Sequence, residues 1–175
     1  MAFLKIVGLC VLAACIYGIL HDQVTARVCV EYFTIGHPRI IRSESPTLLG
    51  LVWGVVATWW FGAILGVVLG VAARAGRPPR LTAREIFSPL LVSLAVLGCA
   101  AFVVGLIGHG LATSGKVQLV GRLAERVPSD RHVAFLAVGF AHAASYLGGV
   151  AVCVVLIVRV LVRRRSLRRA TGGSG

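Results

Sequence analysis

Four long stretches of apolar residues alternate with shorter polar segments along the chain. The apolar stretches cover residues 3–20, 48–73, 89–113 and 131–162. A helix of about 20 apolar residues is long enough to cross the ~30 Å hydrocarbon core of a membrane. A helix also satisfies all of its backbone hydrogen bonds within one segment, as the membrane interior requires. The pattern therefore predicts an all-α fold: a polytopic membrane protein whose four transmembrane helices form a bundle.

The polar segments carry weaker signals, which predict short interfacial helices beside the bundle. Residues 21–47 predict a helical extension of the first span or a short helix lying at the membrane interface. Thr82, with Glu85 three residues later, is typical of a capping box. It predicts a short interfacial helix from about Ala83, before a third span that begins at Pro89. Apolar positions at helical spacing between residues 117 and 127 indicate a short amphipathic helix.

The length of 175 residues is that of one domain. We assign residues 1–171 to a single four-helix membrane domain, and residues 172–175 (GGSG) resemble an artificial linker. The first apolar run could also be a signal peptide, because residues 12–15 (LAAC) match a lipoprotein cleavage box. Since the apolar run continues past this box as far as Leu20, a retained helix is the favoured interpretation.

Composition supports a membrane location and changes the meaning of the charge. Hydrophobic residues make up 58% of the chain, and the net charge is +12. Such a charge would suggest a nucleic-acid partner in a soluble protein, but no groove-reading element accompanies it, and we expect no nucleic acid to bind. Here the basic residues flank apolar segments, where they attract anionic lipids. We expect anionic lipids at the basic tail, residues 163–169.

The distribution of basic residues predicts the orientation. If the N-terminus is cytoplasmic, that side carries eleven of the Lys and Arg residues and the other side carries seven. Cytoplasmic segments of membrane proteins are enriched in Lys and Arg. The chain is therefore predicted to be a multi-pass protein of the inner (plasma) membrane with both termini in the cytoplasm.

Small residues recur at every fourth position of the second span. They form a glycine ridge made of Gly50, Gly54, Thr58, Gly62, Gly66 and Gly70. Such a ridge lets a neighbouring helix approach closely. It indicates either packing within the bundle or a homo-oligomer interface. The second interpretation gives an alternative function, that of a non-catalytic oligomeric or accessory membrane subunit.

All five histidines fall toward one side of the membrane under this topology. His21 ends the first span, and His37 follows in the first connection. His109 lies about one turn before the end of the third span. His132, at the start of the fourth span, is expected to be exposed, whereas His142 lies about 15 Å into that span at ~1.5 Å per residue. Histidine deep in an apolar helix is costly unless it faces the bundle interior and has a partner, so it indicates a functional site.

The histidines, with nearby carboxylates and tyrosines, predict a metal site at the exoplasmic membrane boundary. The candidate metal ligands are His21, His37, His109 and His142; the candidate catalytic carboxylates are Asp22 and Glu31; and the candidate cofactor-binding residues are Tyr17 and Tyr146, each four residues from a histidine. Imidazoles with a carboxylate suit zinc, copper or iron. A bound metal would make the chain a membrane enzyme that acts on a membrane-dissolved substrate.

Other motifs add little to this prediction. Haem b held between His109 and His142 is a further alternative, which would make the chain an electron carrier. The sequence contains no HExxH motif and no GxSxG motif. Its five cysteines form no CxxC pair, and all except Cys29 lie inside apolar spans, where cysteine packs as a small hydrophobe.

Overall fold

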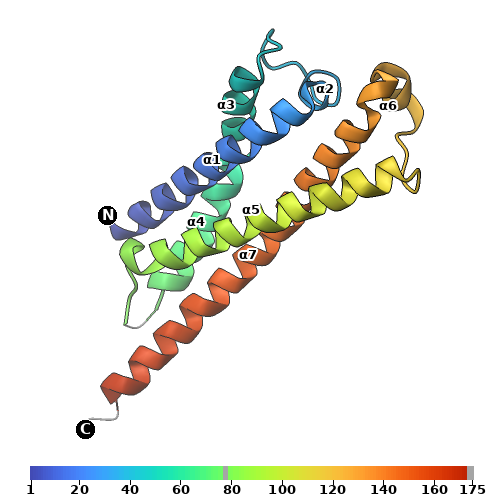
Figure 1. Cartoon of the computed structure of the whole chain (residues 1–175). Coiled ribbons are helices and arrows are strands. Elements are labelled where there is room, and N and C mark those ends of the chain that lie inside the picture. The colour runs from blue at the N-terminus through green and yellow to red at the C-terminus, as the bar shows by residue number, and fades with distance from the viewer. Residues whose placement is uncertain (77–78, 173–175) are drawn as a thin grey trace.

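The computed structural model describes residues 1–76 and 79–172, and Figure 1 shows its helices. The elements are α1 (Ala2–Val28), α2 (Val30–Thr34), α3 (Pro46–Val56), α4 (Trp59–Arg74), α5 (Ala83–Thr113), α6 (Gly121–Arg126), the 3₁₀ helix η1 (Ser129–Arg131) and α7 (His132–Gly172). Within the described residues, four helical stretches (2–28, 46–74, 83–113 and 129–170) are long and apolar enough to cross a membrane. The predicted all-α, four-helix membrane fold is confirmed.

The first helix is longer than its apolar run. α1 continues to Val28 and ends where Cys29 adopts an extended backbone conformation. Polar side chains in the added turns bond to the helix itself: the Thr25 hydroxyl donates to the His21 carbonyl at 3.2 Å, and Arg27 donates to the Gln23 carbonyl at 2.6 Å. The short helix α2 follows directly. The connection therefore contains both features that the sequence suggested, a helical extension and a short separate helix.

The second span covers residues 46–74, close to the predicted 48–73, but it is not one continuous helix. The helix is interrupted at Ala57 and Thr58, between α3 and α4. The Thr58 hydroxyl donates to the Gly54 carbonyl at 2.5 Å, and the Thr58 amide donates to the Val55 carbonyl, three residues back, at 3.2 Å. Threonine back-bonding of this kind bends helices. It accounts for the break in an otherwise apolar segment.

The predicted interfacial helix before Pro89 does not exist as a separate element. α5 begins at Ala83 and contains Pro89. The capping interaction is present, because the Glu85 carboxylate accepts from the Thr82 amide at 2.8 Å. Proline removes one hydrogen bond from the helix. The helix nevertheless continues, because Ile86 and Leu90, on either side of Pro89, are both buried in the same core cluster.

The glycine ridge packs within the chain. α1 lies along α3 and α4, and the ridge glycines meet its backbone and small side chains. A Cβ atom at Gly62 would lie 2.8 Å from the Cys10 carbonyl oxygen, and one at Gly66 would lie 2.7 Å from the Cα atom of Val7. Packing within the bundle is therefore what this pattern encodes, and α1 covers the ridge.

The other two spans form a second helix pair. α5 packs along α7, and fewer contacts join this pair to the first one, through α1 with α5 and α4 with α7. Figure 1 shows both termini and the α4–α5 connection at one end of the bundle, and the other two interhelical connections at the opposite end. A core cluster that includes Ile6, Leu69, Ile86 and Leu156 joins the two pairs.

Arg164 holds the end of the bundle that carries the termini. Its guanidinium donates to the carbonyl oxygens of Ala72, Ala75 and Pro79 at 2.6, 2.7 and 2.9 Å. Carbonyls at the end of a helix have no partner within the helix. The buried Arg164 side chain supplies this partner to α4, while the basic tail continues as part of α7.

Candidate metal site

The structure brings together His21 and Asp22 of α1 with His142 of α7. A nitrogen of each imidazole and an oxygen of the Asp22 carboxylate all lie within 4.8 Å of one another. His142 Nε2 is 3.6 Å from Asp22 Oδ1, and the rings of His21 and His142 meet edge to face with centroids 4.7 Å apart. Among the residues that the structure describes, His21, Asp22 and His142 form the one group of metal-ligating side chains that are close enough together to hold a metal ion.

Local structure explains how these side chains meet. The extension of α1 keeps His21, Asp22 and Thr25 on one helix, where positions three and four apart share a face. A Cβ atom at Gly50 would lie 2.9 Å from the Asp22 carbonyl oxygen, so glycine lets α3 press against the back of this turn. Asp22 is only 4% exposed and His142 only 7% exposed. Two potentially charged side chains are thus buried together.

Thr25 orients the His142 ring. His142 Nε2 lies 3.3 Å from Thr25 Oγ1, and the Thr25 hydroxyl donates its proton to the His21 carbonyl oxygen. A hydroxyl has one proton to donate, so Thr25 accepts from Nε2–H of His142. This tautomer places a proton at Nε2, and a metal ion bound there would replace it.

The residues fit a transition metal ion. Two imidazoles and a carboxylate are a donor set for zinc, iron or copper. Ligand atoms bound tetrahedrally at about 2.0–2.2 Å lie about 3.3–3.6 Å apart. His142 Nε2 and Asp22 Oδ1 are already 3.6 Å apart. Since all three atoms lie within 4.8 Å of one another, side-chain movements of about 1 Å would bring them around one ion.

Aromatic rings cover the site from the α2 side. The ring centroids of Tyr32 and Phe33 lie 4.7 and 5.7 Å from that of His142, and burial raises the pKa of Tyr32 to about 12. His37 belongs to this outer layer and not to the metal group. Its Nδ1 lies 2.9 Å from the Tyr32 carbonyl oxygen, and its ring is 4.9 Å from that of Trp53.

The two tyrosines that share helix faces with histidines occupy different places. Tyr17 stacks on His21 with ring centroids 5.9 Å apart, and its hydroxyl is 2.7 Å from Ser145 Oγ. This hydrogen bond links α1 to α7 beside the site. Tyr146 is about half exposed, and its ring centroid lies 6.4 Å from that of His142.

Glu31, the second candidate carboxylate, is engaged elsewhere. Its Oε2 accepts from Arg131 Nε at 3.1 Å and from Cys29 Sγ at 3.3 Å. Partial burial raises the pKa of Glu31, but hydrogen bonds from the backbone, Cys29 and Arg131 outweigh this effect and leave that pKa below its ordinary value. Burial and the neighbouring Glu31 raise the pKa of the Cys29 thiol to about 11, so Cys29 stays protonated at neutral pH.

Two further histidines also lie outside the metal group. His109 is exposed on α5, where it lines a groove between α1 and α5. His132 was expected to be exposed, and this is wrong. It is partly buried, because its Nε2 bonds to the Val127 carbonyl at 3.0 Å and folds the ring back onto the preceding turn.

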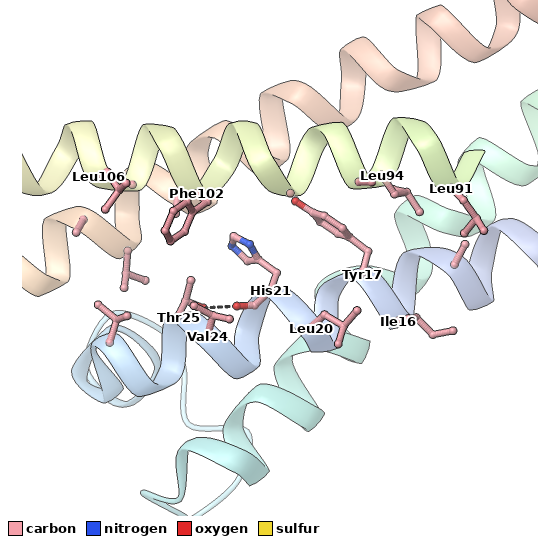
Figure 2. A pocket seen from close by; sticks show the side chains of 18 of the residues that line it. Ile16, Tyr17, Leu20, His21, Val24, Thr25, Leu91, Leu94, Phe102 and Leu106 are labelled. Atoms are coloured by element: carbon pink, nitrogen blue, oxygen red, sulfur yellow. Dashed lines mark hydrogen bonds between the residues drawn. The ribbon is translucent and has the colours of Figure 1, made fainter. Parts of the chain in front are cut away.

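An apolar groove borders the site. It has a volume of about 740 Å³, and it lies between α1 and α5 with α7 as its floor. Figure 2 shows His21 and Tyr17 pointing from α1 toward α5, with Phe102 beside His21 and Leu94 beside Tyr17. His21 Nε2 is buried and has no hydrogen-bond partner. Among the described residues, it is the one buried side-chain nitrogen or oxygen of which this is true.

Sequence reasoning missed Thr25, Tyr32 and Ser145. Thr25 follows Asp22 by three residues, a spacing that places both on one helix face. Ending the first span at Leu20 hid that relation. Tyr32 and Ser145 approach from other elements, and no spacing in the chain predicts those contacts. No protein-family model, curated protein or solved structure matches this chain, so its function is inferred from its own residues.

Proposed function

We propose that this chain is a multi-pass membrane protein that binds one transition metal ion through His21, Asp22 and His142. The chain would be an enzyme that uses this ion to act on a membrane-dissolved substrate. The observation that carries the proposal is a buried carboxylate beside two imidazoles, one of which has an unpartnered nitrogen. Leaving a buried polar group unsatisfied costs about 1–3 kcal/mol. A bound ion would remove this cost and justify the burial of Asp22.

The surrounding residues have distinct roles in this proposal. His21, Asp22 and His142 would hold the ion, which would supply Lewis-acid chemistry: the polarisation of a substrate oxygen or a lower pKa for a bound water. Thr25 holds the His142 ring in place, and Tyr32 and Phe33 exclude bulk water. Asp22 is a ligand in this arrangement, and Glu31 stabilises the link between α2 and α7.

The proposed location of the site follows from charge. The basic residues of the tail and Lys5 lie at the end of the bundle that carries both termini. We place that end in the cytoplasm, because basic residues are retained there. His21 is near the far end of α1, so the site lies in the exoplasmic half of the bundle.

Metal analysis tests the proposal directly. The protein is purified in detergent without chelators, and its metal content is measured together with that of His142→Ala and His109→Ala. We expect about one ion per chain in the wild type and in His109→Ala, and a large loss in His142→Ala. Added metal should also raise the melting temperature, since a ligand at 100 times its Kd stabilises a protein by about 2.7 kcal/mol. Substoichiometric metal with no uptake on addition, or full occupancy in His142→Ala, would contradict the proposal.

An accessory subunit that assembles through the glycine ridge is the weaker candidate. The ridge residues Gly50, Gly54, Gly62, Gly66 and Gly70 all face α1 at close range. A second copy would have to displace α1 to reach them.

A further inference from the structure

The groove beside His21 is built for a hydrocarbon chain. The lining side chains are almost all apolar, and its polar groups come from Tyr17, His21, Thr25 and His109. On facing walls, Leu20 and Phe102 both remain more than half exposed, so the groove opens to the side of the bundle. In a membrane that side is hydrocarbon, and the natural occupant is apolar.

The position of His21 divides the groove into unequal arms. Along α1, the lining runs from Leu9 to Val28, about 28 Å at ~1.5 Å per residue. His21 lies about 18 Å from the Leu9 end and about 10 Å from the Val28 end. One leaflet of a membrane is about 15 Å thick, half of the ~30 Å hydrocarbon core. The Leu9 arm therefore holds a chain as long as one leaflet, and the Val28 arm does not.

The charge of the lining favours some occupants over others. In the part of the chain that the structure describes, no Lys or Arg lines the groove. An anionic phosphate head group would find no cationic partner beside His21. A head group of one or two oxygen atoms, a hydroxyl or a carboxyl, needs only His21 or the proposed metal ion as its partner and matches the site better.

We propose that the groove binds a single-chain amphiphile with an oxygen-bearing head group, of the fatty-acid or fatty-alcohol class. The head group lies at His21, one of the proposed metal ligands, and the tail extends toward Leu9 and Phe87. This inference rests on the proposed function, since it treats the groove as the substrate's route to the metal. It names the substrate class: one aliphatic chain, entering laterally from the membrane.

Photo-labelling of the detergent-purified full chain tests the inference. The probe is palmitic acid carrying a diazirine in its tail, and diazirine-labelled phosphatidylcholine is the two-chain comparison. Ala95→Trp places an indole in the Leu9 arm, because Ala95 lines the groove. Val96→Trp is the matched control, because Val96 is the next residue on α5, is 64% exposed and is not part of the lining. Gly98→Leu narrows the same arm with a smaller side chain.

We expect saturable labelling of α1 and α5 peptides by the palmitic acid probe in the wild type and in Val96→Trp. Labelling should fall about tenfold in Ala95→Trp, which corresponds to about 1.4 kcal/mol of binding free energy. Labelling of Gly98→Leu should also be lower than that of the wild type. Non-saturable labelling, equal labelling in all variants, or equally strong saturable labelling by the phosphatidylcholine probe would overturn the inference. A change of oligomeric state in Ala95→Trp without loss of labelling would also overturn it.

Metal content measured on the same samples separates the two proposals. Ala95 is not among the metal ligands, so Ala95→Trp should keep its metal. Saturable lipid labelling in a protein that binds no metal would contradict the proposed function alone. Full metal content with unsaturable labelling would contradict the groove inference alone.

Discussion

Replacing Gly54 by alanine should push the first two spans slightly further apart and destabilise the fold. A Cβ atom at Gly54 would lie 2.5 Å from the Cα and N atoms of Ile19 and 2.7 Å from the carbonyl carbon of Gly18. These are backbone atoms of α1, and no side-chain rotation can move them away. The helices must shift apart until the new contact reaches about 3.5 Å, the near end of the optimal carbon–carbon separation. The required displacement is about 1 Å.

The energetic consequence follows from that displacement. A gap of about 0.5–1 Å forfeits a quarter to a half of the van der Waals attraction of the atoms it separates. Gly62 and Gly66 continue the same contact surface with α1, so the loss extends beyond one residue. Overpacking of this kind costs about 1–3 kcal/mol. We expect Gly54→Ala to lower the free energy of unfolding by this amount.

Gly8 provides the matched control. It lies on α1, and nothing lies within 4 Å of the position that its Cβ atom would occupy. Alanine is favoured over glycine in helices by about 0.5–1 kcal/mol, so Gly8→Ala should leave stability unchanged or raise it slightly. The assay is reversible denaturation in mixed micelles, followed by circular dichroism. If Gly54→Ala were as stable as Gly8→Ala, close packing of α1 on the ridge would be refuted.

Two further predictions concern the ends of the bundle. Arg164→Ala removes three hydrogen bonds to α4 and the following connection, and hydrogen bonds to charged groups contribute about 1.5–3 kcal/mol each. It should lower the melting temperature clearly, whereas Arg165→Ala, at an exposed position, should not. Equal melting temperatures in the two variants would contradict the role given to the Arg164 hydrogen bonds. Glu31 pairs with Arg131, and its pKa is below the ordinary value of 4.5 in the folded chain. The pair therefore stabilises the protein above that pH and is lost as the pH falls through the folded pKa. Glu31→Gln should flatten this acid-side loss in pH-dependent melting curves, and a curve parallel to wild type would contradict the assignment.

The sequence predicted the spans well because a helix that crosses the hydrocarbon core of a membrane must be apolar over its whole length. Boundaries were less predictable, since α1 continues through His21, Asp22 and Arg27, residues that usually end an apolar helix. Arg27 donates to Thr47 of α3, and His21 and Asp22 meet His142 of α7; only tertiary packing supplies these contacts. The break at Thr58 was also hidden, because threonine was counted among the small residues of the ridge and its hydroxyl bonds to its own helix.

The metal group was predictable in part for a similar reason. Burial costs identified His142, and its neighbours His21 and Asp22 lie on the interior face of α1. The candidate residues do not all meet in one site. The position of a residue along a membrane helix predicts how deep it lies in the membrane, but not in which direction around the helix axis its side chain points. His109 shares roughly the right depth, but it lines the exposed groove between α1 and α5 and is not part of the metal group. Glu31 lies outside the metal group, and Arg131, one hundred residues later, engages its carboxylate.

Uneven packing between helices explains why the site and the groove occur together. The glycine ridge gives α1 a close fit to α3 and α4, and α5 fits closely along α7, so each pair satisfies its own packing. The seam between α1 and α5 has no such ridge: Gly98 is the α5 glycine facing Tyr17, and a Cβ atom there would still be 3.7 Å away. Close packing leaves few voids within each pair, and the groove lies at the seam. Polar side chains placed at the seam stay buried while bordering the groove, and this combination lets His21 meet a molecule that arrives through the membrane.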